Sequence, residues 1–351
     1  MDLSQSAEVD GSVADGPVTQ VEDLWFATDM IVIRAEDKAF RVPAGILAAR
    51  SSVFRDMISL PPPTNDAIEN MDGIPIVHLH DSADDVAAFL RAIYDSRYAF
   101  ACYHGLFLPA PAPIDFSVVL GILRLSHKYD VQYLYRRSLE HLRVDGWYAE
   151  NYDEDDTAHL LNGLSNWDYN PLIPLQVICD AGAVGALWLL PIAYYCLSAS
   201  SGEDLLPLLD GKFAHPVGKA LAARGHMVRV ALATHRFAMP DDSSCYAPST
   251  CDTARSMVLA QRLDEVSEPR LNPVTPNLEA TTMEKLNALG MCSDCRAVAK
   301  AVLSVAATAF WDELPGLFGL PPWAELYAMK RTAMGEDIDG EVRHSDEAQA
   351  S

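Results

Sequence analysis

Four of the seven cysteines have a spacing that could bind a metal ion. Two residues separate Cys292 from Cys295, a gap that lets both thiolates reach one tetrahedral zinc, and the pair follows Gly290, a turn-forming residue. Cys245 and Cys251 lie about 40 residues earlier in a proline-flanked loop, and the five residues between them are many for a zinc knuckle. Two interpretations are open: a structural zinc site made by all four cysteines, or reduced thiols without a ligand. A redox CxxC is disfavoured because no βαβ pattern surrounds it.

No local motif for catalysis or cofactor binding is present. The sequence contains no GxGxxG, GxxxxGK[ST], HExxH or GxSxG pattern, and its ten histidines are scattered. We therefore expect a protein that is not an enzyme; the alternative is an enzyme whose unrecognised site forms only when the helical second half folds. His78 and His80 lie two apart on an expected strand, and the acidic run at residues 153–156 lacks calcium-loop spacing. Both are expected to be solvated surface.

The cysteine count and the N-terminus favour an intracellular protein, in the cytoplasm, the nucleus or both. Seven cysteines is an odd number, and the start MDLSQSAEVDG has neither the basic nor the apolar region of a signal peptide. Cys102, Cys179 and Cys196 lie alone near apolar runs and are expected to be core or loop thiols. Residues 181–202 carry no charge, but their helical periodicity predicts two buried helices joined at Pro191 rather than a membrane span.

The net charge excludes one class of function. The 351 residues carry 26 Lys and Arg against 49 Asp and Glu, a formal charge of −23, which argues against nucleic-acid binding through a general basic surface. Residues 1–24, 145–156 and 332–351 each hold six acids. We expect disordered acidic tails at 1–23 and 332–351 and an acidic linker at 145–170. Half of the residues are apolar, enough to bury a sizeable core in about two domains.

The first half alternates short strands with helices. Apolar runs at residues 30–33 and 39–42 flank a short polar turn and predict a β-hairpin, and residues 76–79 predict a third strand. Two short helices are expected to meet near residues 50–52, before a proline-rich loop. Further helical periodicity follows up to residue 142. The pattern predicts an α+β domain with helices around a small sheet.

Two runs in this half resemble a known family. DMIVIRAEDKAFRVPAGILAARSSVFRDM resembles the opening of a BTB (POZ) domain, with its Asp-led strand, hairpin, Leu-Ala-x-x-Ser helix pair and aromatic residue before Met. LRLSHKYDVQYLYRRSLEHL is similar to the family's closing helical pair, and the resemblance covers residues 24–144. Pro43 stands where the family usually has His. Ala44 stands where BTB transcription factors place a base that pairs with the strand's Asp, here Asp29, which weakens an expectation of corepressor recruitment.

The resemblance implies protein–protein interaction, through a homodimer or a BTB heterodimer. Family dimers commonly bury the first short helices and the strand before them, which here correspond to Leu24, Trp25, Phe26, Ile46, Leu47, Phe54 and Met57. The alternative role is a substrate adaptor of a cullin-type ubiquitin ligase, with a cullin as partner. The loops and the second half, including GALWLLPIAYYC, are similar to uncharacterised BTB proteins of mushroom-forming fungi.

The second half predicts a different class of domain. From residue 171 to 331 strand signals largely disappear, and apolar residues repeat at helical spacing, which predicts an all-α C-terminal domain. Residues 217–236 form a basic patch without Asp or Glu, expected to be a solvated face or a docking surface for an acidic segment. Its members are Lys219, Arg224, His226, Arg229, His235 and Arg236. Neither nucleic acid nor a membrane is expected as a partner.

Overall fold

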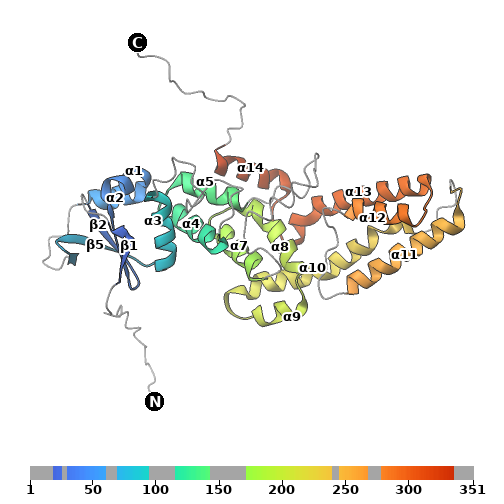
Figure 1. Cartoon of the computed structure of the whole chain (residues 1–351), viewed down its shortest axis with the longest axis horizontal. Coiled ribbons are helices and arrows are strands. Elements are labelled where there is room, and N and C mark those ends of the chain that lie inside the picture. The colour runs from blue at the N-terminus through green and yellow to red at the C-terminus, as the bar shows by residue number, and fades with distance from the viewer. Residues whose placement is uncertain are drawn as a thin grey trace, which may run out of the picture. The chain divides into compact units, whose positions relative to one another are not determined.

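The chain divides into two compact units in a computed structural model (Figure 1). Met1–Leu108 with Leu125–Leu134 form the first, called the sheet unit, and Pro109–Arg124 with Tyr135–Ser351 form the second, called the helical unit. The structure describes residues 19–25, 30–60, 69–94, 115–142, 171–238, 245–267 and 278–335. The linker expected at residues 145–170 lies outside the described residues, as does most of each expected tail.

Regular structure extends into both segments that the sequence assigned to tails. Strand β1 covers Thr19–Trp25, because these residues pair with a strand further along the chain, a partner that local composition does not reveal. Helix α14 covers Trp323–Met334 and ends at Gly335, whose φ of 74° is the left-handed conformation that favours glycine at a helix end. Ordered elements therefore begin before residue 24 and continue beyond residue 331.

The sheet unit contains five strands in the order β1-β3-β2-β5-β4. Strands β2 (Met30–Ala35) and β3 (Lys38–Pro43) pair antiparallel, and β5 (Ile74–Leu79) pairs parallel with β2. The predicted hairpin and third strand are confirmed. The short β4 (Asn70–Met71) forms within a segment that the sequence predicted as loop, because it pairs with β5.

Five helices contribute to this unit or continue from it. They are α1 (Ala44–Arg50), α2 (Ser52–Ser59), α3 (Ala83–Tyr94), α4 (Phe116–Lys128) and α5 (Gln132–His141), and the end of α4 and the start of α5 are the parts assigned to the sheet unit. Their apolar faces and the sheet bury a common core. Its fully enclosed large side chains include Ile33, Phe40, Leu47, Phe54, Phe89 and Leu90. The unit is thus the α+β domain that the sequence predicted.

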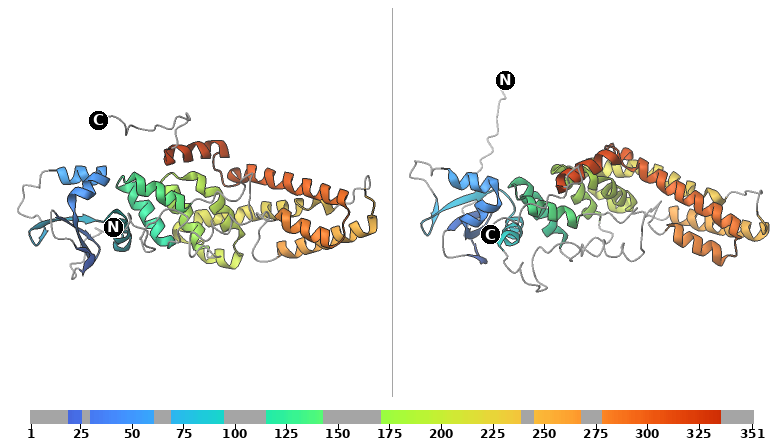
Figure 2. Two further views of the ribbon diagram at one scale, coloured as in Figure 1. Left: turned by 45° about the horizontal axis from the view of Figure 1, so that its top comes forward. Right: turned by 90° about the horizontal axis from the view of Figure 1, so that it is seen from above.

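The described part of the helical unit contains only helices and turns, as predicted (Figures 1 and 2). In Figure 2, α11, α12 and α13 run side by side in both views. The regular helices from residue 171 onward, apart from α14, are α7 (Leu172–Ala183), α8 (Leu190–Ala199), α9 (Gly202–Leu205), α10 (Ala214–Ala233), α11 (Pro248–Ser267), α12 (Leu278–Ala288) and α13 (Ser293–Leu317). A 3₁₀ turn, η3 (Leu187–Leu189), leads directly into α8.

The uncharged stretch at residues 181–202 contains the end of α7 and all of α8, which confirms the two predicted helices, but the break between them lies at residues 184–186 rather than at Pro191. α7 ends near Gly185, whose φ is 76°, and α8 carries Pro191 in its first turn, where a proline needs no hydrogen-bond partner for its nitrogen. Most of the α8 side chains are buried in the helical unit. Among the described residues, no helix combines the length and apolar character that a membrane crossing requires.

Two basic side chains of α10 hold neighbouring helix ends together. Arg224 donates from Nη1 to the carbonyl oxygens of Ser198, at 2.9 Å, and Ser200. Lys219 donates from Nζ to the carbonyl of Phe318 at 2.8 Å. Because these carbonyls lie at the ends of α8 and α13, the cations satisfy acceptors that the helices themselves leave unpaired. These two members of the predicted basic patch therefore have a structural role.

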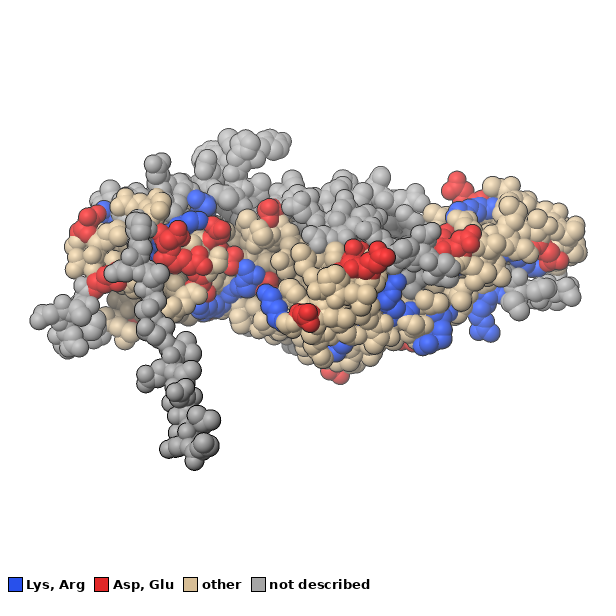
Figure 3. All heavy atoms as spheres, turned by 90° about the horizontal axis from the view of Figure 1, so that it is seen from below, with Lys and Arg blue, Asp and Glu red and all other residues tan. Residues whose placement is uncertain are grey.

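The remaining basic side chains of α10 do not create a uniform positive field. His226 lies 3.0 Å from a carboxylate oxygen of Glu313, and Arg229 lies 3.4 Å from the His226 ring. Figure 3 shows Lys and Arg interspersed with Asp and Glu on the face that it draws, and neither sign covers that face. The basic side chains Lys219, Arg224, His226 and Arg229 of α10 therefore have local polar partners.

His235 is the buried member of the basic patch. Its side chain is 4% exposed and lies 3.0 Å from the Thr234 hydroxyl. Burial, together with the nearby positive charges of Arg262 and Lys285, lowers the pKa of His235 to about 4, although Glu265 opposes the shift. The folded protein therefore holds this imidazole neutral.

The neutral His235 should make the stability of the helical unit depend on pH. The unfolded chain binds a proton near pH 6.5 and the folded chain only near 4, so the stabilising contribution is complete above pH 6.5 and is lost as the pH falls to 4. Between pH 8 and 4 the His235 side chain should lower the free energy of unfolding by roughly 2–4 kcal/mol, and we expect His235→Gln to remove this decrease, measured by thermal unfolding across that range. His215→Gln, which changes an exposed histidine in the first turn of α10, is the matched control, and an unchanged slope in His235→Gln would refute the assignment.

Candidate functional site

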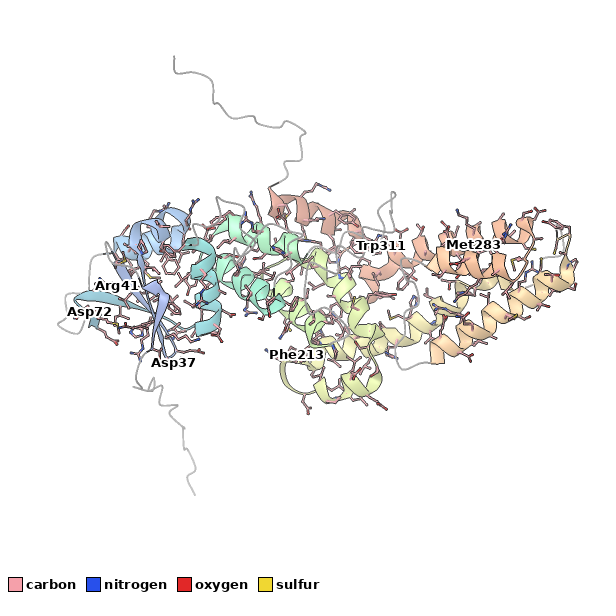
Figure 4. All side chains as sticks on the ribbon, viewed as in Figure 1. Asp37, Arg41, Asp72, Phe213, Met283 and Trp311 are labelled. Atoms are coloured by element: carbon pink, nitrogen blue, oxygen red, sulfur yellow. The ribbon has the colours of Figure 1, made fainter. Side chains whose placement is uncertain are left out.

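The four cysteines that the sequence singled out lie together in the helical unit. Cys245 precedes α11, Cys251 lies in its first turns, Cys292 is the N-cap of α13, and Cys295 follows in the first turn of that helix. Their four Sγ atoms all lie within 4.8 Å of one another. Met283, labelled in Figure 4, lies on α12 and packs against the buried cluster that contains these cysteines. The structure therefore brings together every cysteine of the predicted set.

The turn between α12 and α13 positions one pair of thiols. The N–H of Gly290 donates to the carbonyl of Asn287 at 3.0 Å, and the N–H of Met291 donates to that of Leu286 at 3.0 Å, the two bonds of a Schellman motif. Gly290 adopts the required left-handed conformation with a φ of 77°. Leu286 and Met291 are both buried, which supplies the apolar contact of that motif. The chain can then begin α13 at once, with Cys292 as its cap.

A mostly apolar shell encloses the thiols. Cys251, Cys292 and Cys295 are at most 5% exposed, whereas Cys245 is half-buried. The N–H of Cys292 donates to the Cys251 sulfur at 3.3 Å. The buried side chains of this cluster include Phe237, Ala254, Val258, Leu286, Met291, Ala299 and Leu303. The sulfurs therefore have restricted access to water and lie in contact with one another.

A buried cation lies against the cluster. Arg255 is 5% exposed and donates from Nη2 to the Cys295 sulfur at 3.0 Å. Its Nη1 also contacts a carboxylate oxygen of Asp252 at 3.1 Å, although the Asp252 side chain is largely exposed. Sequence reasoning missed Arg255, yet a signal was present, because it lies four residues after Cys251 and therefore on the same face of a helix.

The surroundings shift the pKa values of three of the thiols in different directions. Backbone N–H groups at the start of α13, chiefly that of Cys295, hold the pKa of Cys292 well below its usual value. Burial raises the pKa of Cys251 and that of Cys295. Cys292 is thus favoured as a thiolate, whereas Cys251 and Cys295 need a nearby cation to lose their protons. Four sulfur donors would leave a tetrahedral metal no open position, an arrangement suited to structure rather than to catalysis.

In the sheet unit, Ser51 connects two regions that are far apart in the sequence. Its hydroxyl accepts from the N–H of Phe54 at 3.0 Å, capping α2, and donates to the carbonyl of Tyr129 at 2.5 Å. Next to it, the Ser52 hydroxyl donates to the carboxylate of Asp130. The serine of the Leu-Ala-x-x-Ser run and the Lys-Tyr turn near residue 129 therefore form one hydrogen-bonded cluster.

Tyr129 connects this cluster to α2 and to the segment before α3. Its ring stacks on Phe54 with centroids 4.7 Å apart, and its hydroxyl donates to Asp81 at 2.6 Å. Lys128 pairs with the same carboxylate at 2.7 Å. Burial, and the hydrogen bond to Asp81, raise the pKa of Tyr129 above its usual value, so the phenol stays a donor. Aromatic packing and hydrogen bonding thus fix the same side chain.

An exposed face lies on α1 and the start of α5. Ile46 is 47% exposed, and Arg50, one turn later on α1, lies over the ring of Tyr133 at 5.5 Å from its centroid. Tyr133 is itself 37% exposed, although burial of its remaining surface raises its pKa. We call Ile46, Arg50 and Tyr133 the α1 face. It joins an aliphatic, a cationic and an aromatic side chain, a combination enriched where proteins associate.

The comparison with family models decides the class of the sheet unit. Residues 20–145 match the model of the BTB/POZ domain. The chain carries a BTB/POZ domain. The match includes Ser51, Tyr129 and the α1 face. No curated protein and no solved structure matches the chain in the corresponding searches.

The predicted interface residues differ in their exposure within the BTB domain. Leu47 and Phe54 are fully buried in its own core, Ile46 is exposed, and Met57 is half-buried. Leu47 and Phe54 therefore act as core residues in this chain, and outward contact from α1 falls to Ile46. Phe26 and the side chains of Leu24 and Trp25 lie outside the described part of the structure. Arg50 and Tyr133 were not anticipated, although Arg50 follows Ile46 at the spacing of one helical face.

The other candidate residues from the sequence form no shared site among the described residues. His78 lies on β5 and its Nε2 is 2.7 Å from a carboxylate oxygen of Glu69, while His80 follows the strand and is exposed. Cys179 lies on α7 and Cys196 on α8. The acidic run at residues 153–156 and Cys102 lie outside the described residues.

A pocket of about 460 Å³ opens in the helical unit near α14. Its described lining provides two hydroxyls, from Tyr135 and Thr332, and no carboxylate, imidazole or thiol. The Tyr135 hydroxyl already donates to the carbonyl of Val184 at 3.3 Å. The apolar part of the lining is formed by Val184, Gly185, Trp188, Ala328, Met329 and Ala333. This wall lacks the convergent polar groups that acid–base or nucleophilic catalysis requires.

Removing the Ser51 hydroxyl should weaken the BTB domain. Ser51→Ala deletes the cap of α2 and leaves the buried carbonyl of Tyr129 without that donor, so we expect a loss of about 1–3 kcal/mol. Hydrogen–deuterium exchange of α2 and α4 amides in the full chain measures it. Ser59→Ala, which removes only an exposed bond to the Arg55 carbonyl, is the control. Equal protection in both variants would show that Ser51 does not hold these elements together.

Proposed function

We propose that this chain is a protein-interaction protein that forms a homodimer, or pairs with another BTB protein, and recruits partners through its BTB domain. A BTB/POZ domain supports a role in protein interaction in general. The finer proposal depends on one observation, the α1 face. There Ile46 exposes nearly half of its surface beside the stacked Arg50 and Tyr133.

The chemistry of this face supports association. An aliphatic side chain that is 47% exposed gains free energy when a second surface removes it from water. Arg50 and Tyr133 already contact one another, so each loses less conformational freedom when a partner packs on the pair. Arginine and tyrosine are also among the residues that contribute most at interfaces. The α1 face therefore has both an apolar anchor and a rigid polar rim.

A charge at position 46 should oppose this association. We expect the full chain to be a dimer at tens of micromolar by size-exclusion chromatography with light scattering, and Ile46→Glu to weaken it at least about tenfold, because the variant loses the apolar contact of Ile46 and must remove a carboxylate from water, even beside Arg50. Met257→Glu is the matched control, since Met257 is similarly exposed, at 53%, on α11 of the helical unit.

Two results would contradict the proposal. A wild-type chain that is strictly monomeric alone, and that captures no BTB protein when the two are mixed, would refute association through this domain. Equal weakening by Ile46→Glu and Met257→Glu would place the contact elsewhere. Circular dichroism of both variants shows that the helices are retained, so a failure to fold is distinguished from a lost interface.

A cullin adaptor is the alternative within the same class. In this role the BTB domain would bind the cullin, and the helical unit, which forms a compact body of its own, would hold a substrate. We expect purified full chain to retain a cullin N-terminal region in a pull-down if this role applies. If no cullin is retained under conditions in which an established BTB adaptor binds, the cullin adaptor role is refuted and the role in recruiting other partners stands.

A further inference from the structure

We propose that Cys245, Cys251, Cys292 and Cys295 bind one structural zinc ion as a tetrathiolate site. The site lies in the helical unit, outside the BTB match, and the inference does not depend on the proposed association. Three independent features of the structure support it: the distances between the sulfurs, the groups that surround them, and the elements that they join.

The sulfur positions fit a tetrahedron. With Zn–S bonds of about 2.3 Å, the sulfurs of a tetrathiolate site are about 3.8 Å apart. The four Sγ atoms lie within 4.8 Å of one another, so movements of about an ångström or less per side chain complete the geometry. Two cysteines come from the start of α11 and two from the start of α13, which approaches the two-plus-two pattern of structural zinc sites.

The surroundings fit a negatively charged centre. Zinc with four thiolates carries two negative charges, and a buried site of that kind needs donors to its sulfurs. Arg255 supplies a buried guanidinium at 3.0 Å from the Cys295 sulfur, and the Cys292 N–H supplies a second donor at 3.3 Å from the Cys251 sulfur. The buried Nε of Arg255 has no hydrogen-bond partner in the described part of the chain. Asp252, whose side chain is largely exposed, pairs with Nη1 of Arg255, and the Nη2 that contacts the Cys295 sulfur is better matched by an anionic cluster than by neutral thiols.

The position of the site explains what the ion would do. The shell around the sulfurs includes small residues such as Ala254 and Ala299, which bury little apolar surface. Four Zn–S bonds would join the segment before α11 to the turn that starts α13 and fix the end of this helix group. The hydroxyl of Tyr246, which accepts from the N–H of Ser293 at 3.2 Å, already links the same two segments. The site would therefore stabilise the fold, and with all four positions taken by sulfur it has no room for a substrate.

Metal content of the full chain tests the inference. We expect about one equivalent of zinc per chain after expression with zinc and purification without chelator. Cys295→Ser should reduce this at least about fivefold, because loss of one ligand opens the site. Cys179→Ser replaces a thiol outside the cluster and should leave the zinc content unchanged. Cobalt in place of zinc should give the strong visible absorption of a tetrahedral thiolate complex.

A second measurement covers variants that fail to fold. Alkylation of the wild-type chain, counted by mass spectrometry, should spare all four cluster cysteines while zinc is bound and modify them after a chelator removes it. Less than about a tenth of an equivalent of zinc, after reconstitution with zinc under reducing conditions, would overturn the inference. Disulfides between cluster cysteines in the reduced preparation, or full zinc content in Cys295→Ser, would overturn it equally.

Discussion

One buried hydroxyl joins distant parts of the BTB domain. Ser51 ends the turn between α1 and α2 and at the same time holds the chain near residue 129, which is 78 residues away in the sequence. Hydrophobic burial supplies most of the stability, but it does not fix how two segments are oriented relative to each other. The Ser51 hydrogen bonds fix the orientation, because Ser51 can cap α2 and donate to the Tyr129 carbonyl only when these two segments have one relative position. The stacking of Phe54 on Tyr129 then adds apolar contact at the same place.

This constraint determines which side chains the domain can present outward. With α2 fixed on Tyr129, Phe54 faces the core, and α1 turns Leu47 inward and Ile46 outward. Arg50 lies one turn beyond Ile46 and rests over Tyr133, which follows closely on Tyr129 in the chain. The same local structure that closes the core therefore assembles the exposed α1 face. Its side chains are held by the fold rather than by a flexible loop.

Much of this organisation could be predicted from the sequence where the signal was local. The alternation around residues 30–42 gave the hairpin, and the Cys292–Cys295 spacing pointed to the thiol cluster. Pairings between distant segments gave no local signal: β1 and β4 form only because β3 and β5 lie beside them. The orientation of Leu47 and Phe54 was missed for the same reason, since which side of a short helix is buried depends on distant packing. Arg224 and Lys219 looked like surface charge because a carbonyl partner leaves no trace in the sequence.

Helix α10 packs against most of the other long helices of the helical unit. Its 20 residues span about 30 Å, and the helix contacts α7, α8, α11 and α13. Arg224 fastens it to the end of α8 and Lys219 to the end of α13. Unfolding of α10 would therefore remove contacts from all four of these helices together, which couples their stabilities.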